Sequence, residues 1–312
     1  MRTSRHLSSS RGFTLVEAVM VIVITGIVAG IVAVFIKQPV DSYFDSARRA
    51  ELTDIADTAV RRMTRDIHLA LPNSVRNPAD GSDLCVEFIP TRVGARYRAA
   101  LEGTTGNGDI LNFTSDTSLD AAGSAAPDGK FDMLGVNSAL PAPDRIIAGD
   151  VVVVFNDGSA SGNAYTGANA IQVASVAEPG GTANTTAITF VDAVTATPFN
   201  RKQLPSESPA YRFQVIPTGE HVVAYGCSGG KLYRYSRALA AAWALPANCA
   251  AMTGGASSAV LAENVNACSL KYEAPSASTG LGRSGIVSIS LELTQSGESV
   301  GLYHQVHVDN SP

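Results

Sequence analysis

The chain begins with a long apolar stretch, which is followed by an amphipathic one. Residues 18–36 are 19 consecutive uncharged and mostly apolar residues, enough to cross most of a hydrocarbon core. Between Asp41 and Leu71, apolar residues recur at steps of three and four, which is typical of a helix with one side to bury. They are Phe44, Leu52, Ile55, Ala59, Val60, Met63, Ile67 and Leu71. Pro39 is expected to kink this helix, and Pro72 is expected to end it.

Beyond the helix the pattern changes to short runs rich in Val, Ile, Tyr and Phe, bounded by Gly, Pro, Asn and Ser. Such runs predict β-strands. The expected strands are Leu84–Ile89, Asp109–Phe113, Val151–Phe155, Ile171–Val176, Ala187–Val191, Tyr211–Ile216, His221–Tyr225, Lys231–Tyr235, Cys268–Glu273, Ile286–Leu293 and Val300–Val308. The predicted fold class is therefore α+β, with a long N-terminal helix packed on a mainly antiparallel β head.

Three local features of the head are predicted as well. Residues 211–235 are expected to form a meander of three strands, with turns at 217–220 and 228–230. A short helix is expected at Arg237–Leu245. The Ala-, Gly- and Ser-rich stretches 115–142 and 236–262 are expected to be long loops.

Charge is distributed unevenly along the 312 residues. The chain has 23 Lys and Arg against 28 Asp and Glu, a net charge of −5. Three arginines and no acid lie in the first twelve residues, ahead of the apolar stretch. By the positive-inside rule that end stays in the cytoplasm and residues beyond Lys37 are exported. The acidic remainder argues against a general nucleic-acid binder.

One acid, Glu17, interrupts the apolar stretch. A carboxylate in a membrane segment costs on the order of 2–3 kcal/mol, so it is a functional candidate unless it reaches the headgroups. A secretory signal peptide is disfavoured, because the run ends at Lys37 without the small residues of that cleavage site.

The segment RGFTLVEAVMVIVITGIVAGIV, which starts at Arg11, resembles the N-terminus of type IV prepilins and type II secretion pseudopilins. The resemblance implies that a prepilin peptidase cuts between Gly12 and Phe13 and methylates the new Phe13 amine. It implies that Glu17 pairs with the terminal amine of a neighbouring subunit. That pairing is physically reasonable, because an α-amino group is largely cationic at neutral pH and ion pairs strengthen in low dielectric.

The same resemblance divides the chain into four segments. Residues 1–12 are a leader, 13–38 a transmembrane helix, 39–72 its amphipathic continuation and 73–312 the exported head. The implied partners are prepilin peptidase, other minor and major pilins, the inner-membrane assembly platform and the membrane itself. The implied location is the inner membrane, and then the pilus or pseudopilus, at its tip.

Parts of the head are similar to the large J-type minor pilins, and residues 46–57 of the helix resemble biogenesis components of mannose-sensitive haemagglutinin (MSHA) pili. The head segments are 226–235, 261–265 and 302–310. Residues 103–200 carry no motif that assigns them a role.

The four cysteines, Cys85, Cys227, Cys249 and Cys268, all follow the apolar helix and are expected to be exported. Two disulfides are expected, and three connectivities are compatible with four cysteines. Of these, Cys249–Cys268 with Cys85–Cys227 is the predicted pairing.

No catalytic constellation and no cofactor site stand out. His304 and His307 are expected to point to opposite faces of one strand. The run Asp128–Asp132 hints at calcium but lacks the alternating oxygen ligands of an EF-hand. An assembly subunit is therefore the predicted function, with a pilus-tip binding module and a membrane-tethered hydrolase as alternatives.

Overall fold

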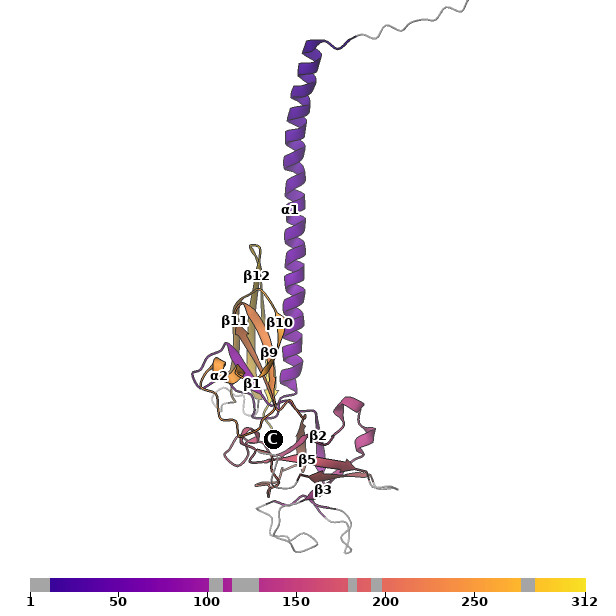
Figure 1. Cartoon of the computed structure of the whole chain (residues 1–312), viewed down its shortest axis with the longest axis vertical. Helices are drawn as coiled ribbons and strands as arrows, with labels where there is room; N and C mark the ends of the chain where they lie inside the picture. The colour runs from indigo at the N-terminus through magenta and orange to yellow at the C-terminus, as the bar shows by residue number, and fades with distance from the viewer. Residues whose placement is uncertain (1–11, 101–108, 114–128, 179–183, 192–197, 276–283) are drawn as a thin grey trace, which may run out of the picture. The chain divides into compact units, whose positions relative to one another are not determined.

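The computed structural model describes residues 12–100, 109–113, 129–178, 184–191, 198–275 and 284–312. The chain divides into two compact units, Met1–Glu51 and Leu52–Pro312. Helix α1 (Leu15–His68) contributes residues to both units (Figure 1). The predicted leader, apart from Gly12, lies outside the described residues.

In the first unit, α1 carries a series of exposed apolar side chains from Leu15 to Ile36, and Glu17 is the only charged residue among them. The helix contains one stretch that is long and apolar enough to cross a membrane. Helical structure continues through Pro39. The helix ends at His68, earlier than the predicted end at Pro72, because the backbone of Leu71 donates a hydrogen bond to Ile89 O instead of continuing the helix.

In the second unit, the last four turns of α1 bury one face. Leu52, Ala56, Met63 and Ile67 are each at most 1 % exposed and belong to one core with strands from two sheets. The spacing of three and four residues along α1 is therefore a true amphipathic pattern, as predicted.

Two antiparallel sheets cover this face of the helix. The first has the order β1-β8-β9-β10, formed by β1 (Cys85–Phe88), β8 (Val222–Ser228), β9 (Lys231–Arg237) and β10 (Ser257–Ala262). The second has the order β11-β12-β13, formed by β11 (Val265–Glu273), β12 (Ser284–Gln295) and β13 (Glu298–Asp309). Alternate residues of β12, from Gly285 to Leu293, are buried, so one face of that sheet is packed.

A closed six-stranded barrel is inserted between β1 and β8. Its order is β2-β3-β6-β5-β4-β7. The strands are β2 (Val93–Tyr97), β3 (Lys130–Leu134), β4 (Val151–Val154), β5 (Ala170–Ala177), β6 (Thr185–Phe190) and β7 (Arg212–Ile216). Side chains fill its interior, including Tyr97, Phe131 and Phe213. Three 3-10 turns, Asn137–Ala139, Ala142–Asp144 and Ala164–Thr166, lie in its connections. Figure 1 shows β2, β3 and β5 grouped apart from β1, β9, β11 and β12.

The α+β class and ten of the eleven predicted strands are confirmed, within one to three residues at most ends. Asp109–Phe113 is not a strand. Leu111 and Phe113 are buried in the barrel core, but their backbone makes only irregular contacts, such as Leu111 N–H to Arg98 O. Strands β2, β3 and β10 are not among the predicted strands. Gly94 and Arg96 weaken the strand pattern of β2, and four of the six residues of β10 are Ser or Ala.

The predicted three-strand meander is wrong. Strand β7 pairs with β2 and β4 in the barrel, whereas β8 pairs with β1 and β9. The turn at 217–220 is therefore a crossing from the barrel to the first sheet, and only the β8–β9 hairpin with its turn at 228–230 is as expected.

The predicted helix at Arg237–Leu245 is also wrong. Its Ala-rich sequence favours a helix, but tertiary contacts take its backbone groups. Trp243 N–H donates to Tyr165 O, and the Arg76 guanidinium donates to the carbonyl oxygens of Trp243 and Ala244. A short helix, α2 (Cys249–Thr253), forms instead, and the side chain of Asn248 caps it by accepting from Ala251 N–H.

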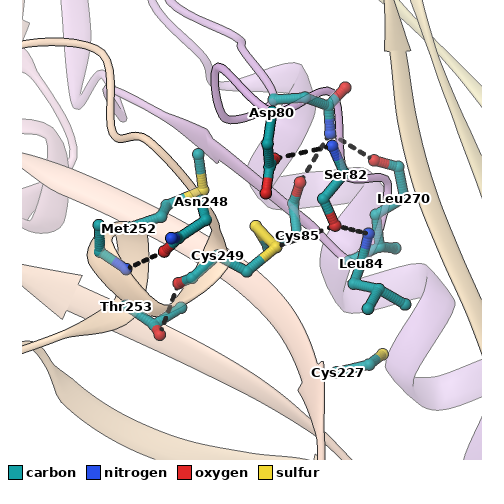
Figure 2. The surroundings of a disulfide bond; sticks show 12 residues. Asp80, Ser82, Leu84, Cys85, Cys227, Asn248, Cys249, Met252, Thr253 and Leu270 are labelled. Carbon is teal, nitrogen blue, oxygen red and sulfur yellow. Dashed lines mark hydrogen bonds between the residues drawn. A yellow bond between two sulfur atoms is a disulfide. The ribbon is translucent and has the colours of Figure 1, made fainter.

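All four cysteines form disulfides, but the predicted pairing is wrong. The bonds are Cys85–Cys249 and Cys227–Cys268. Cys85 lies opposite Gly226 in the β1–β8 ladder, and side chains alternate along a strand, so the next residue, Cys227, points to the other face. Cys85 packs with Ala224 and Met252 against α2, whereas Cys227 and Cys268 border the helix-facing core. Figure 2 shows Cys249 beside Cys85, with Cys227 apart from both.

Candidate processing and assembly site

The start of α1 is fixed by Thr14. Its side-chain oxygen accepts a hydrogen bond from Glu17 N–H at 3.3 Å, and its carbonyl accepts from Ala18 N–H at 3.1 Å. This is the geometry of an N-cap, which satisfies one of the backbone donors left without a partner in the first turn. Residues 14–17, Thr-Leu-Val-Glu, match the capping-box pattern. This pattern is a sequence signal for Thr14, which is not among the predicted site residues.

Gly12 and Phe13 precede the cap and are not helical. The Phe13 side chain is 80 % exposed, and a Cβ built on Gly12 would meet no atom within 4 Å. The peptide bond between them is therefore in accessible, non-helical chain directly before a rigid helix. Exposed chain of this kind is where proteolytic cleavage is favoured.

Glu17 lies in the first turn of α1, and its side chain is exposed. An acid in this position interacts favourably with the partial positive charge of the helix N-terminus. Within the described residues, its carboxylate has no ion-pair partner on the same chain. The carboxylate is thus held near the helix start and remains available to a cation.

Residues 7–33 match the family model described as the prokaryotic N-terminal methylation motif. The match spans the residues just described, namely Gly12 and Phe13, the Thr14 cap, Glu17 and most of the apolar half of α1. No curated protein and no solved structure matches the chain. The motif is the N-terminal signal of type IV pilins and pseudopilins, so the chain has the signal of a processed subunit of that kind.

The signal and the apolar helix together fit a membrane-anchored protein with a single span and an exported head. The motif also implies processing by prepilin peptidase and assembly with pilins. Because it covers only the N-terminal part of the chain, it carries no information about the head.

The remaining sequence candidates are dispersed over the head. His304 faces α1 beside His68, while His307 lies on the other face of β13, as their spacing predicts. In the run Asp128–Asp132, Asp128 lies outside the described residues. Asp132 is in β3 and forms an ion pair with Arg98 at 3.2 Å.

Lys130, in the same run, forms an ion pair with an acid outside it. The Asp109 carboxylate accepts a hydrogen bond from Lys130 Nζ at 2.7 Å and thereby raises the pKa of Lys130. Across the part of the chain that the structure describes, no three His, Cys, Asp or Glu side chains gather as metal ligands would.

Proposed function

We propose that this protein is a minor pilin or pseudopilin, a non-catalytic subunit that initiates or caps a type IV pilus-like fibre. The observation that carries the proposal is the coincidence of the methylation motif with a capped, exposed apolar helix. Prepilin peptidase would cut between Gly12 and Phe13 and methylate the Phe13 amine. Residues 13–38 would form the membrane anchor, residues 39–72 the connection and residues 73–312 the head.

Glu17 would then pair with the methylated amine of a neighbouring subunit as the helix leaves the membrane. The fibre interior is a bundle of similar apolar helices, so the transfer replaces lipid contacts with helix contacts. In that low dielectric an unpaired carboxylate or amine is costly, so the pair favours subunits in register. The inner-membrane assembly platform and other minor and major pilins would be the partners.

At a finer level, we assign the chain to an MSHA-like system, as a component of the MshO type located near the fibre tip. This assignment is supported by the similarity of the helix segment 46–57 and of the J-type head segments. A type II secretion pseudopilin of the J type has the same N-terminal features and is the main alternative.

The processing step is tested by mass spectrometry of the chain purified from membranes. The expected species lacks residues 1–12 and carries one additional methyl group on Phe13. A matched variant, Gly12→Leu, should keep the leader, because the peptidase requires a small residue before the cut. A chain that keeps Met1, or that is cut near Lys37, would contradict the proposal.

A further inference from the structure

Two arginines lie directly opposite each other on the outside of the barrel. Strands β2 and β7 are antiparallel, with Arg96 paired to Arg212 and Gly94 paired to Gln214. Next to them, Tyr97 N–H donates to Tyr211 O at 3.0 Å. Because hydrogen-bonded and non-hydrogen-bonded pairs alternate in such a ladder, Arg96 and Arg212 form a non-hydrogen-bonded pair, whose Cα atoms are about 4.5 Å apart.

Neither guanidinium is neutralised within the described residues. Both side chains are exposed, and neither forms an ion pair with a described acid. The neighbouring arginines of the barrel differ, since Arg92 pairs with Asp150 at 3.3 Å and Arg98 with Asp132 at 3.2 Å. Like charges placed directly opposite in a sheet destabilise it, so this pair costs stability without a compensating contact in the chain.

The two arginines and four neighbouring residues of β2 and β7 form a hollow on the barrel surface. Gly94, Ala95, Arg96, Arg212, Phe213 and Gln214 line a space of about 370 Å³. Gly94 stands on the same face as the two arginines, two residues along β2 from Arg96, and has no side chain to fill the hollow beside the pair. The Oε1 atom of Gln214 is buried and accepts no hydrogen bond from a described residue. The side-chain amide is therefore not held in one orientation through that oxygen.

We propose that this hollow binds an oxyanion, either a phosphate group or the carboxylate of a sugar acid. Each guanidinium presents a planar fork of N–H donors that matches two oxygens of such a group. An anion between Arg96 and Arg212 converts their repulsion into two charge-assisted contacts. The site is independent of the assembly role proposed above, because it lies in the inserted barrel and uses no residue of the helix.

The test is equilibrium dialysis of radiolabelled inorganic phosphate against the full chain in detergent micelles, at constant ionic strength set by sodium chloride. One saturable site is expected. Arg96→Gln and Arg212→Gln should each weaken binding by about tenfold, the effect of losing one charge-assisted hydrogen-bonded partner. Arg62→Gln is the matched control, since it removes an exposed arginine of α1 and should leave binding unchanged.

A second variant tests the contribution of the hollow without changing the charge of the site. The backbone of Gly94 is not left-handed, and a Cβ there would meet only Phe213 O, at an ordinary 3.6 Å. Gly94→Thr should therefore fold, because Thr favours strands, yet it fills part of the hollow beside the arginines. We expect it to weaken phosphate binding by about tenfold with both arginines present.

Competition identifies the source of the oxyanion. Displacement of phosphate by glucuronate assigns the carboxylate of a sugar acid as a ligand, and resistance to glucuronate restricts the site to phosphate groups. Binding that does not saturate, that falls equally in Arg62→Gln, or that is unchanged in Gly94→Thr would overturn the proposal. Loss of folding is detected separately by peptide mapping of the two disulfides.

Discussion

Glu17 is the only charged side chain between Phe13 and Ile36, and its carboxylate has no ion-pair partner among the described residues. The Thr14 cap holds the helix start through the backbone N–H of Glu17, not through its carboxylate. Changing the side chain should therefore leave α1 and the Gly12–Phe13 segment intact. If the proposed pairing holds, the change acts at the step at which a second subunit provides the cation.

We predict that Glu17→Gln is cleaved and methylated normally but assembles roughly tenfold less fibre or worse. Breaking one partner of a buried ion pair costs about 3–5 kcal/mol, more than enough for that loss. The measurement pairs mass spectrometry of the N-terminus with quantification of sheared surface fibres. Glu51→Gln, an exposed acid of the same helix, should assemble like the natural chain. Normal fibre yield from Glu17→Gln would exclude the pairing role.

His221 makes the stability of the head depend on pH. It is buried, its Nδ1 accepts a hydrogen bond from Leu239 N–H at 2.8 Å, and its ring meets Phe199 edge-on. Burial lowers the pKa of His221 below its usual 6.5, an effect that the Asp150 charge only partly opposes. The folded state thus favours neutral imidazole, whereas the unfolded chain takes up a proton near pH 6.5.

Stability from His221 is therefore fully present above pH 6.5 and decreases as the pH falls toward the lower folded-state pKa. His221→Asn keeps an acceptor for Leu239 N–H without a group that titrates there. We expect the melting temperature of the natural chain to fall more steeply between pH 6.5 and about 5 than that of the variant. Parallel curves for the two proteins would show that His221 does not contribute.

At the scale of elements, the features that the sequence predicted correctly are those that depend on local sequence pattern. The stripe of buried residues on α1 and apolar strands such as β4, Val151–Val154, follow directly from spacing and composition. Local pattern could not exclude a helix in residues 237–245, because the groups that hold this segment extended belong to Arg76 and Tyr165, far away in the chain. The segment is extended because distant residues use its backbone groups.

The candidate sites also differ in whether local sequence could point to them. Gly12, Phe13 and Glu17 lie within six residues, so a resemblance carried by one short segment was enough to point to them. Arg96 and Arg212 meet only through the register of β2 and β7, which no property of either segment reveals. The disulfide pairing failed for a related reason, since the face on which Cys227 lies depends on the register of β8 against β1.

Peptide mapping without reduction should find the peptides of Cys85 joined to Cys249, and those of Cys227 joined to Cys268. The first bond spans 164 residues, which include the whole barrel, and the second spans 41. Replacing Cys85 and Cys249 together by Ser should lower the free energy of unfolding by about 2–5 kcal/mol, because the unfolded chain gains freedom. The paired variant of Cys227 and Cys268 is the matched comparison, and its loss should be about 1 kcal/mol smaller because its loop is shorter. Recovery of a Cys85–Cys227 peptide would refute the structure at this point.

At the scale of the whole molecule, the head has two separate cores and a joint between them. Every residue of the helix-facing core lies outside 91–219, and every residue of the barrel core lies inside it. The joint brings Leu71, Ile89 and Val222 against barrel residues such as Tyr165, whose hydroxyl donates to Ser74 O at 2.7 Å. This division indicates that the barrel is a module added to a complete helix-and-sheet head.

The module can be removed because its two ends lie together. Phe88 pairs with Val223, so the β1–β8 ladder can be closed by a turn of about two to four residues in place of 91–219. We predict that this shortened chain forms both disulfides and assembles into fibres, since all four cysteines and the helix lie outside the excised segment. It should melt at a lower temperature, because the joint residues lose their apolar cover, and it should bind no phosphate. Deleting β12 and β13 instead removes six of the twenty buried residues of the helix-facing core, namely Val287, Ile289, Leu291, Leu293, Val306 and Val308. This deletion should abolish folding, which makes it the control for a deletion that is not modular. Free thiols in the shortened chain would show that the barrel is required for the head to fold.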